Sequence, residues 1–81
     1  MYQGVRNQPL ETEMLTQHDM AMIMAGTDFH DGLACLSHTG NLFVMYGPSG
    51  VHTLHGDSTD LERLSAHWVG FCSDPRNQMV L

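Results

Sequence analysis

Short runs rich in apolar residues, bounded by turn-forming segments, occur along the middle of the chain and are typical of β-strands. Three such runs, residues 33–37, 42–46 and 51–55, are separated by the short segments 38–41 (HTGN) and 47–50 (GPSG). Each separating segment contains glycine, which adopts the positive φ angle that a tight turn requires. The pattern therefore predicts a three-stranded antiparallel meander.

A first helix is expected before the sheet, within residues 9–26. Thr16 and Asp19 resemble a capping pair, in which each side chain satisfies a free backbone N–H. Met20, Ile23 and Met24 then share one helical face. Because methionines also alternate over residues 20–24, a strand is the alternative, but the Ala and Met content and the glycine at position 26 favour a helix.

A second helix is expected after the sheet. Thr59 and Glu62 have the spacing of a T-x-x-E capping box, and acidic residues favour the positive end of the helix dipole. Leu61, Leu64 and Trp68 follow at helical spacing, and residues 73–75 (SDP) end the helix. Residues 77–81 form a short apolar tail, which is expected to add an edge strand or to dock on a neighbour.

These elements predict an α+β fold in the order α-β-β-β-α, with the three-stranded antiparallel meander packed against two helices. Residues 9–81 form the single domain, and residues 1–8 form a flexible N-terminal arm. Double-stranded-RNA-binding domains share this order, but they grip phosphates with lysines at the start of the last helix. Residues 56–62 (GDSTDLE) are acidic instead, so the resemblance covers topology and implies no RNA binding.

The predicted sheet is unusual because residues 32–56, twenty-five in a row, include no Asp, Glu, Lys or Arg. A first hairpin with a two-residue loop places Leu33 and Cys35 with Leu42, Val44 and Tyr46, on the face opposite Ala34, Leu36, Phe43 and Met45. A three-residue loop with a glycine bulge regroups the residues, but both faces stay largely apolar. We expect one face, or the sheet edge, to bind a second copy or a partner. The alternative is one helix on each face.

The charge of the chain excludes several classes of partner. Its 81 residues include nine Asp and Glu, three Arg and no Lys, which gives a net charge of −6. Binding to nucleic acid or anionic membranes depends on clustered basic residues, so neither is expected. The sequence shows no signal peptide or membrane span, and a cytoplasmic protein with Cys35 and Cys72 reduced is expected. A disulfide between the two cysteines is the alternative.

The candidate groups for chemistry form no local motif. Six histidines are present, but His52 and His55 lie three apart on a predicted strand and so face opposite sides, and His38 falls in a predicted turn. No G-x-S-x-G elbow, HExxH motif or P-loop occurs. We therefore expect no enzyme activity, no cofactor and no metal site.

The leading interpretation is a small, non-enzymatic, acidic protein-binding module. We expect a regulator or inhibitor, such as those encoded by phages and mobile elements against host defences, that docks on a larger protein with a basic surface, for example a nucleic-acid-binding enzyme. A homodimer is a further option. The alternatives are a His/Cys metal or thiol sensor and a structural subunit of a larger assembly.

The candidate contact residues fall into two groups, apolar anchors and acidic residues that steer a basic partner. The anchors are Phe29, Leu42, Val44 and Tyr46. The acidic residues of the candidate site are Asp28, Asp31, Asp57, Asp60 and Glu62, and Glu11 and Glu13 add to the same steering charge. Trp68 and Phe71 are expected in the core.

Overall fold

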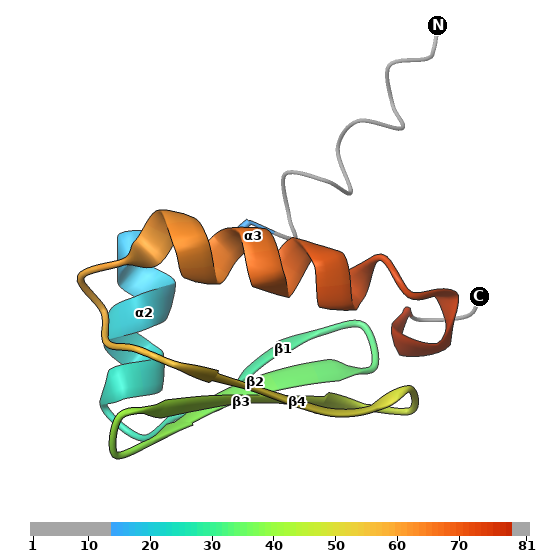
Figure 1. The fold of residues 1–81 in the computed structure, drawn as a ribbon, viewed down its shortest axis with the longest axis horizontal. Helices are drawn as coiled ribbons and strands as arrows, with labels where there is room; N and C mark the ends of the chain where they lie inside the picture. The colour runs from blue at the N-terminus through green and yellow to red at the C-terminus, as the bar shows by residue number, and fades with distance from the viewer. Residues whose placement is uncertain (1–13, 79–81) are drawn as a thin grey trace, which may run out of the picture.

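The computed structural model describes residues 14–78 and shows an α+β fold of two helices and a four-stranded antiparallel sheet (Figure 1). The elements in chain order are α2 (Gln17–Met24), β1 (Phe29–Asp31), β2 (Ala34–Thr39), β3 (Leu42–Gly47), β4 (Gly50–His55), α3 (Leu61–Cys72) and the 3₁₀ turn η2 (Pro75–Asn77). The predicted fold class is confirmed, and strand β1 is an addition to the predicted order.

The four strands form a simple meander, in which each strand pairs with the next along the chain. Thr39 pairs with Leu42, so the β2–β3 loop has two residues, and its first residue, Gly40, has a φ of 62°. A positive φ at this position suits a two-residue hairpin loop. The two-residue register is therefore the one that the protein adopts. It also places His38 on strand β2, so the predicted turn position of this histidine is wrong.

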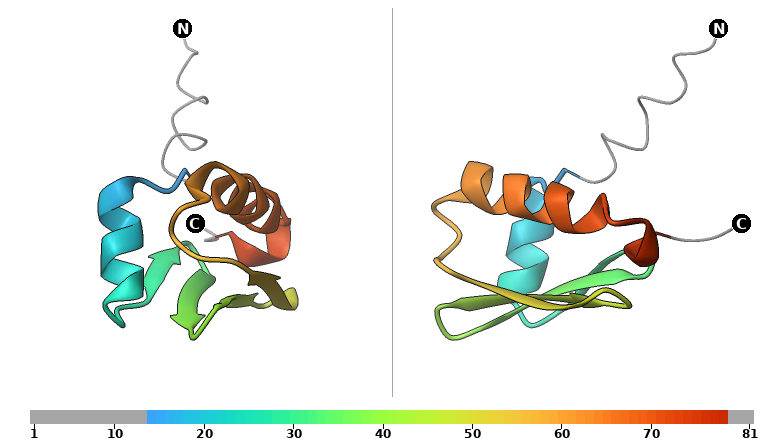
Figure 2. Two further views of the ribbon diagram at one scale, coloured as in Figure 1. Left: turned by 60° about the vertical axis from the view of Figure 1, so that its left-hand side comes forward. Right: turned by 45° about the vertical axis from the view of Figure 1, so that its right-hand side comes forward.

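Both helices pack on the same face of the sheet, with α3 running along it and α2 standing upright beside it, as the views in Figures 1 and 2 show. We call this the inner face. It is defined by Leu36, Phe43 and Met45, which are buried in one core with residues of α2 and α3. The members that the helices contribute to this core are Met20, Ile23, Leu64, Trp68, Phe71 and Cys72. The alternative of one helix on each face is therefore wrong, and neither helix packs on the other, outer face.

The two helices begin with side-chain caps, one of them as predicted. The hydroxyl of Thr16 accepts a hydrogen bond from the amide of Asp19, whose carboxylate accepts one from the amide of Thr16. Helix α3 is capped by Asp60, which accepts from the amide of Arg63, and not by Thr59. The amide and hydroxyl of Thr59 donate to Asp57 instead, so the predicted capping box is wrong by one residue.

Arg63 also joins the first turn of α3 to the last strand of the sheet. Its Nε donates to Asp60 Oδ2 at 2.7 Å, and its Nη2 donates to the backbone carbonyl of His55 at 2.8 Å. The guanidinium thus bridges the carboxylate of a helix cap and the end of β4.

Asn77 fastens the end of the described chain to three other segments. This fully buried side chain accepts from the amide of Ser49 at 3.0 Å and donates to the Ser49 hydroxyl at 2.7 Å and the Phe71 carbonyl at 2.8 Å. Its backbone carbonyl accepts from the amide of Leu33 at 2.9 Å. Asn77 therefore ties the β1–β2 turn, the β3–β4 turn and the end of α3 together.

Some predictions fall on segments that the structure does not describe. The predicted arm of residues 1–8 lies outside residues 14–78, as do Glu11, Glu13 and most of the predicted apolar tail. Within the described part of the chain, neither helix has the length and apolar character needed to cross a membrane.

Candidate functional site

The outer face of the sheet brings together three of the predicted contact residues. Since side chains alternate along a strand, Leu42, Val44 and Tyr46 project away from the core that holds Phe43 and Met45. Val51 is paired with Tyr46 and is 65% exposed. The face is completed by Cys35, Ser37, Thr39, Thr53, His30 and His55, so the strand residues on it include no Asp, Glu, Lys or Arg.

Two other predicted contact residues lie on the inner face. Phe29 is paired with Leu36 and packs edge to face against Trp68, with ring centroids 5.8 Å apart. Asp31 is paired with the buried Ala34, and its Oδ2 atom is buried without a hydrogen-bond partner. Burial raises the pKa of Asp31 above its ordinary value of 3.8. These two residues therefore do not belong to the outer face.

The remaining acidic candidates separate into two places. Asp57, Asp60 and Glu62 lie in the connection from β4 to α3 and at the start of that helix. The pKa values of Asp57 and Asp60 are lowered, first by side-chain hydrogen bonds from Thr59 and Arg63 respectively, so both are ionised at neutral pH. Asp28 directly precedes β1 and reaches the outer face, where its Oδ2 accepts a hydrogen bond from Tyr46 Oη at 3.0 Å.

A cluster of mixed donor groups surrounds Tyr46 on this face. The cluster consists of Asp28, His30 and Cys35, whose carboxylate oxygen, ring nitrogen and sulfur atoms all lie within 4.8 Å of one another. His30 Nε2 is 3.6 Å from Cys35 Sγ. Residues 28 and 30 share a side of the chain because they are two apart along an extended segment, and the pairing of His30 with Cys35 brings in the sulfur.

The environment of the cluster keeps its thiol in the protonated form. Burial raises the pKa of Cys35 above its ordinary value of 9.0, and this exceeds the opposing effect of its hydrogen bond with Tyr46. Hydrogen bonds to Cys35 and then Asp28 raise the pKa of Tyr46. A thiol in this state is a poor nucleophile, because the thiolate is the reactive species. The arrangement gives no support to nucleophilic catalysis at Cys35.

The second cysteine lies on the other side of the sheet. Cys72, the last residue of α3, is buried in the core on the inner side of the sheet, whereas Cys35 is on the outer face, and no disulfide joins them. The disulfide alternative is therefore wrong. His52 and His55 do face opposite sides, as predicted, and the ring of His52 lies 5.3 Å from that of Phe71.

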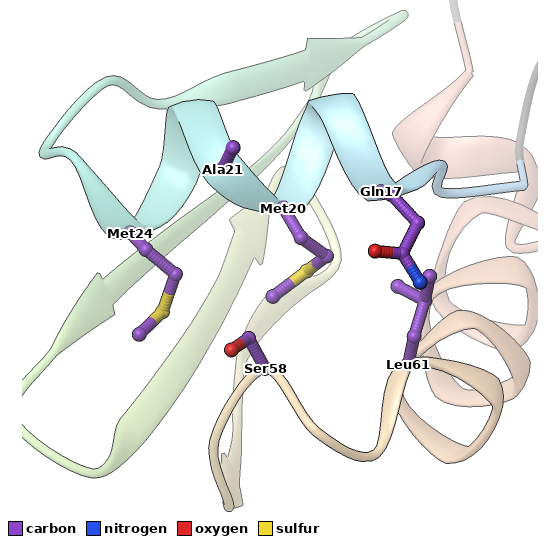
Figure 3. A pocket seen from close by; sticks show the side chains of 6 residues that line it. All are labelled: Gln17, Met20, Ala21, Met24, Ser58 and Leu61. Carbon is purple, nitrogen blue, oxygen red and sulfur yellow. The ribbon is translucent and has the colours of Figure 1, made fainter.

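A separate open pocket of about 280 Å³ lies between α2 and the segment that leads into α3 (Figure 3). Its lining is Gln17, Met20, Ala21, Met24, Ser58 and Leu61. The side chains of Met20 and Ser58 approach each other from opposite walls. None of these lining residues is ionisable, so the pocket offers a mixture of apolar and neutral polar groups without an acid, a base or a charged group.

The chain matches no protein-family model, no curated protein and no solved structure.

Proposed function

We propose that the protein is a non-enzymatic binding module, a regulator or inhibitor, that docks its outer sheet face on a larger protein with a basic surface. The observation that carries this proposal is that neither helix covers the outer face, although Leu42, Val44, Tyr46 and Val51 lie on it. Apolar side chains grouped on an uncovered surface are typical of an interaction site.

The charges of the described residues favour a basic partner over a second copy of the chain. Both described arginines are neutralised, Arg63 by Asp60 and Arg76 by Asp74, each at 2.7 Å. Asp28, at the edge of the outer face, has no basic side chain bonded to it among the described contacts. A net charge of −6 repels a second copy and speeds the approach of a positively charged surface.

The test compares arginine substitutions on and off the proposed surface. Val44→Arg and Val51→Arg place a positive charge on the outer face, whereas Met22→Arg places the same charge on the exposed side of α2. Partners would be captured from lysate on each variant, identified, purified and titrated against the protein at rising salt. We expect a basic-surfaced partner whose affinity falls with salt and falls at least tenfold in the two outer-face variants only.

Two outcomes would contradict the proposal. A partner that is lost with Met22→Arg but retained by both outer-face variants would move the surface to the helices. A stable dimer in native mass spectrometry that dissociates in Val44→Arg would show that the outer face binds a second copy instead. Circular dichroism of each variant controls for folding.

A further inference from the structure

We propose that Asp28, His30 and Cys35 bind one zinc ion on the outer face of the sheet, with water as the fourth ligand. The three residues lie on or directly before the β1–β2 hairpin, so a single local unit supplies every protein ligand. This inference does not rest on the proposed docking function, since it concerns the isolated chain.

The chemistry of the donor set points to zinc. One thiolate, one imidazole and one carboxylate are all ordinary ligands of Zn²⁺. Magnesium and calcium prefer oxygen ligands alone, which His30 and Cys35 do not offer. The mixture of a soft sulfur with nitrogen and oxygen therefore suits a borderline cation.

The geometry is close to that of a tetrahedral site. With Zn–S of about 2.3 Å and Zn–N of about 2.0–2.1 Å, a tetrahedral ion holds sulfur and nitrogen about 3.5–3.6 Å apart. The observed distance from Cys35 Sγ to His30 Nε2 is 3.6 Å. The third donor atom, from Asp28, lies within 4.8 Å of both, so its exposed carboxylate closes the site by a small side-chain movement.

A neighbouring residue orients the carboxylate. Tyr46 Oη donates to Asp28 Oδ2 at 3.0 Å, which leaves Oδ1 for the metal. Hydrogen bonds of this kind fix ligand orientation in metal sites. Cys35 is buried between its strand partners His30 and Tyr46, whereas Asp28 and His30 are exposed, so an ion enters from the solvent side and keeps one position open to water. On binding, the Cys35 thiol transfers its proton to solvent, and the sulfur–zinc bond replaces the S–H bond.

The test measures metal binding to the reduced, metal-free chain by native mass spectrometry and isothermal titration calorimetry with Zn²⁺. Co²⁺ serves as a spectroscopic probe, because a sulfur-to-cobalt charge-transfer band reports a cysteine ligand. We expect one Zn²⁺ per chain, a charge-transfer band with Co²⁺, and a higher melting temperature with Zn²⁺. His30→Ala and Cys35→Ser should each lower the affinity at least a hundredfold, and Tyr46→Phe should lower it about tenfold.

The matched control is His55→Ala, which removes another exposed histidine from the same face but not from the cluster. It should bind Zn²⁺ as the unchanged protein does. Because His30 is exposed, His30→Ala tests the site even if Cys35→Ser does not fold. Absence of stoichiometric Zn²⁺ from the unchanged protein, or undiminished binding in His30→Ala, would overturn the inference. Neither result depends on whether a protein partner docks on this face.

Discussion

Replacing Asn77 with alanine should remove much of the stability of this domain. The Asn77 side chain is fully buried and makes three hydrogen bonds, two with Ser49 and one with the carbonyl of Phe71. Asn77→Ala removes one donor from the Phe71 carbonyl, which keeps the amide of Asp74 at 3.3 Å, and leaves the Ser49 amide without its acceptor. A buried polar group that loses its partner costs about 1–3 kcal/mol, and a half-buried one costs less.

The expected loss for Asn77→Ala is therefore about 1–3 kcal/mol in the free energy of unfolding. This is a large share of the total, because a domain of this size is stable by only about 4–12 kcal/mol. Urea unfolding measures the change, and the fluorescence of the single, buried Trp68 reports it.

Two further variants at the same end of the chain separate the causes. Gln78→Ala removes a hydrogen bond from an exposed side chain to the Cys72 carbonyl at 3.0 Å, and should cost no more than about 1 kcal/mol. Asn77→Asp keeps an acceptor for Ser49 but cannot donate to Phe71 when it is ionised, so it should be at least as unstable as Asn77→Ala. A loss below about 0.5 kcal/mol in Asn77→Ala would refute the reasoning, because such changes are typical of plain surface positions.

Three other predictions follow from contacts and charges of the described residues. Gly47→Ala should destabilise the protein by about 1–3 kcal/mol, since its added Cβ would lie 2.8 Å from Asn77 Oδ1 and 3.1 Å from the Leu33 carbonyl oxygen. Urea unfolding measures the loss, and an unchanged unfolding midpoint would contradict the prediction. Asp31→Asn should raise the melting temperature at pH 7, because burial raises the pKa of Asp31 and its ionised form therefore destabilises the fold at pH values above 3.8. The gain in melting temperature should shrink below pH 3.8, and an equal gain at pH 3 would refute this cause. NMR titration should show Asp74 with a pKa of about 2, because hydrogen bonds from Arg76 hold its carboxylate ionised. The stabilisation from this ion pair is present above pH 3.8 and is lost as the pH falls towards 2. Arg76→Ala should raise the pKa of Asp74, and an unchanged pKa would point to another cause.

The parts of the fold that have strong local signals were predictable from the sequence. The Thr16–Asp19 cap and the glycine-containing turns of the sheet depend on contacts within a few residues, and all are present. Strand β1 was missed because it has three residues, two of them polar, and it is held by pairing with β2. The cap of α3 was misplaced by one residue because Thr59 and Asp60 are both good capping residues, and the contact with Arg63 favours the latter.

The candidate site was predictable only in part, for the same reason. Leu42, Val44 and Tyr46 share a face in either register, and the two-residue loop, which the sequence offered as one of two options, is what places Cys35 beside them. The donor cluster depends on β1, so a search for histidine and cysteine spacing did not find it. The D-x-H spacing of Asp28 and His30, with Cys35 across a short turn, would have revealed the cluster once residues 29–31 were treated as a strand. Asn77 gave no signal, since Leu33 and Ser49, which it joins to the end of α3, are distant in sequence.

The bridge made by Arg63 bears on whether a strand of another molecule can add to the edge of the sheet. Strand β4 is an outer strand of the sheet, and its six residues include neither proline nor lysine, the usual deterrents to the addition of a foreign strand. The Arg63 guanidinium donates a hydrogen bond to the carbonyl of His55 at one end of this strand, and a second hydrogen bond to Asp60 fixes its position. In a chain without lysine, an arginine of helix α3 thus protects one end of the edge strand. A strand of another molecule that pairs with β4 at this end would first have to break the Arg63–Asp60 ion pair and displace Arg63 from the His55 carbonyl.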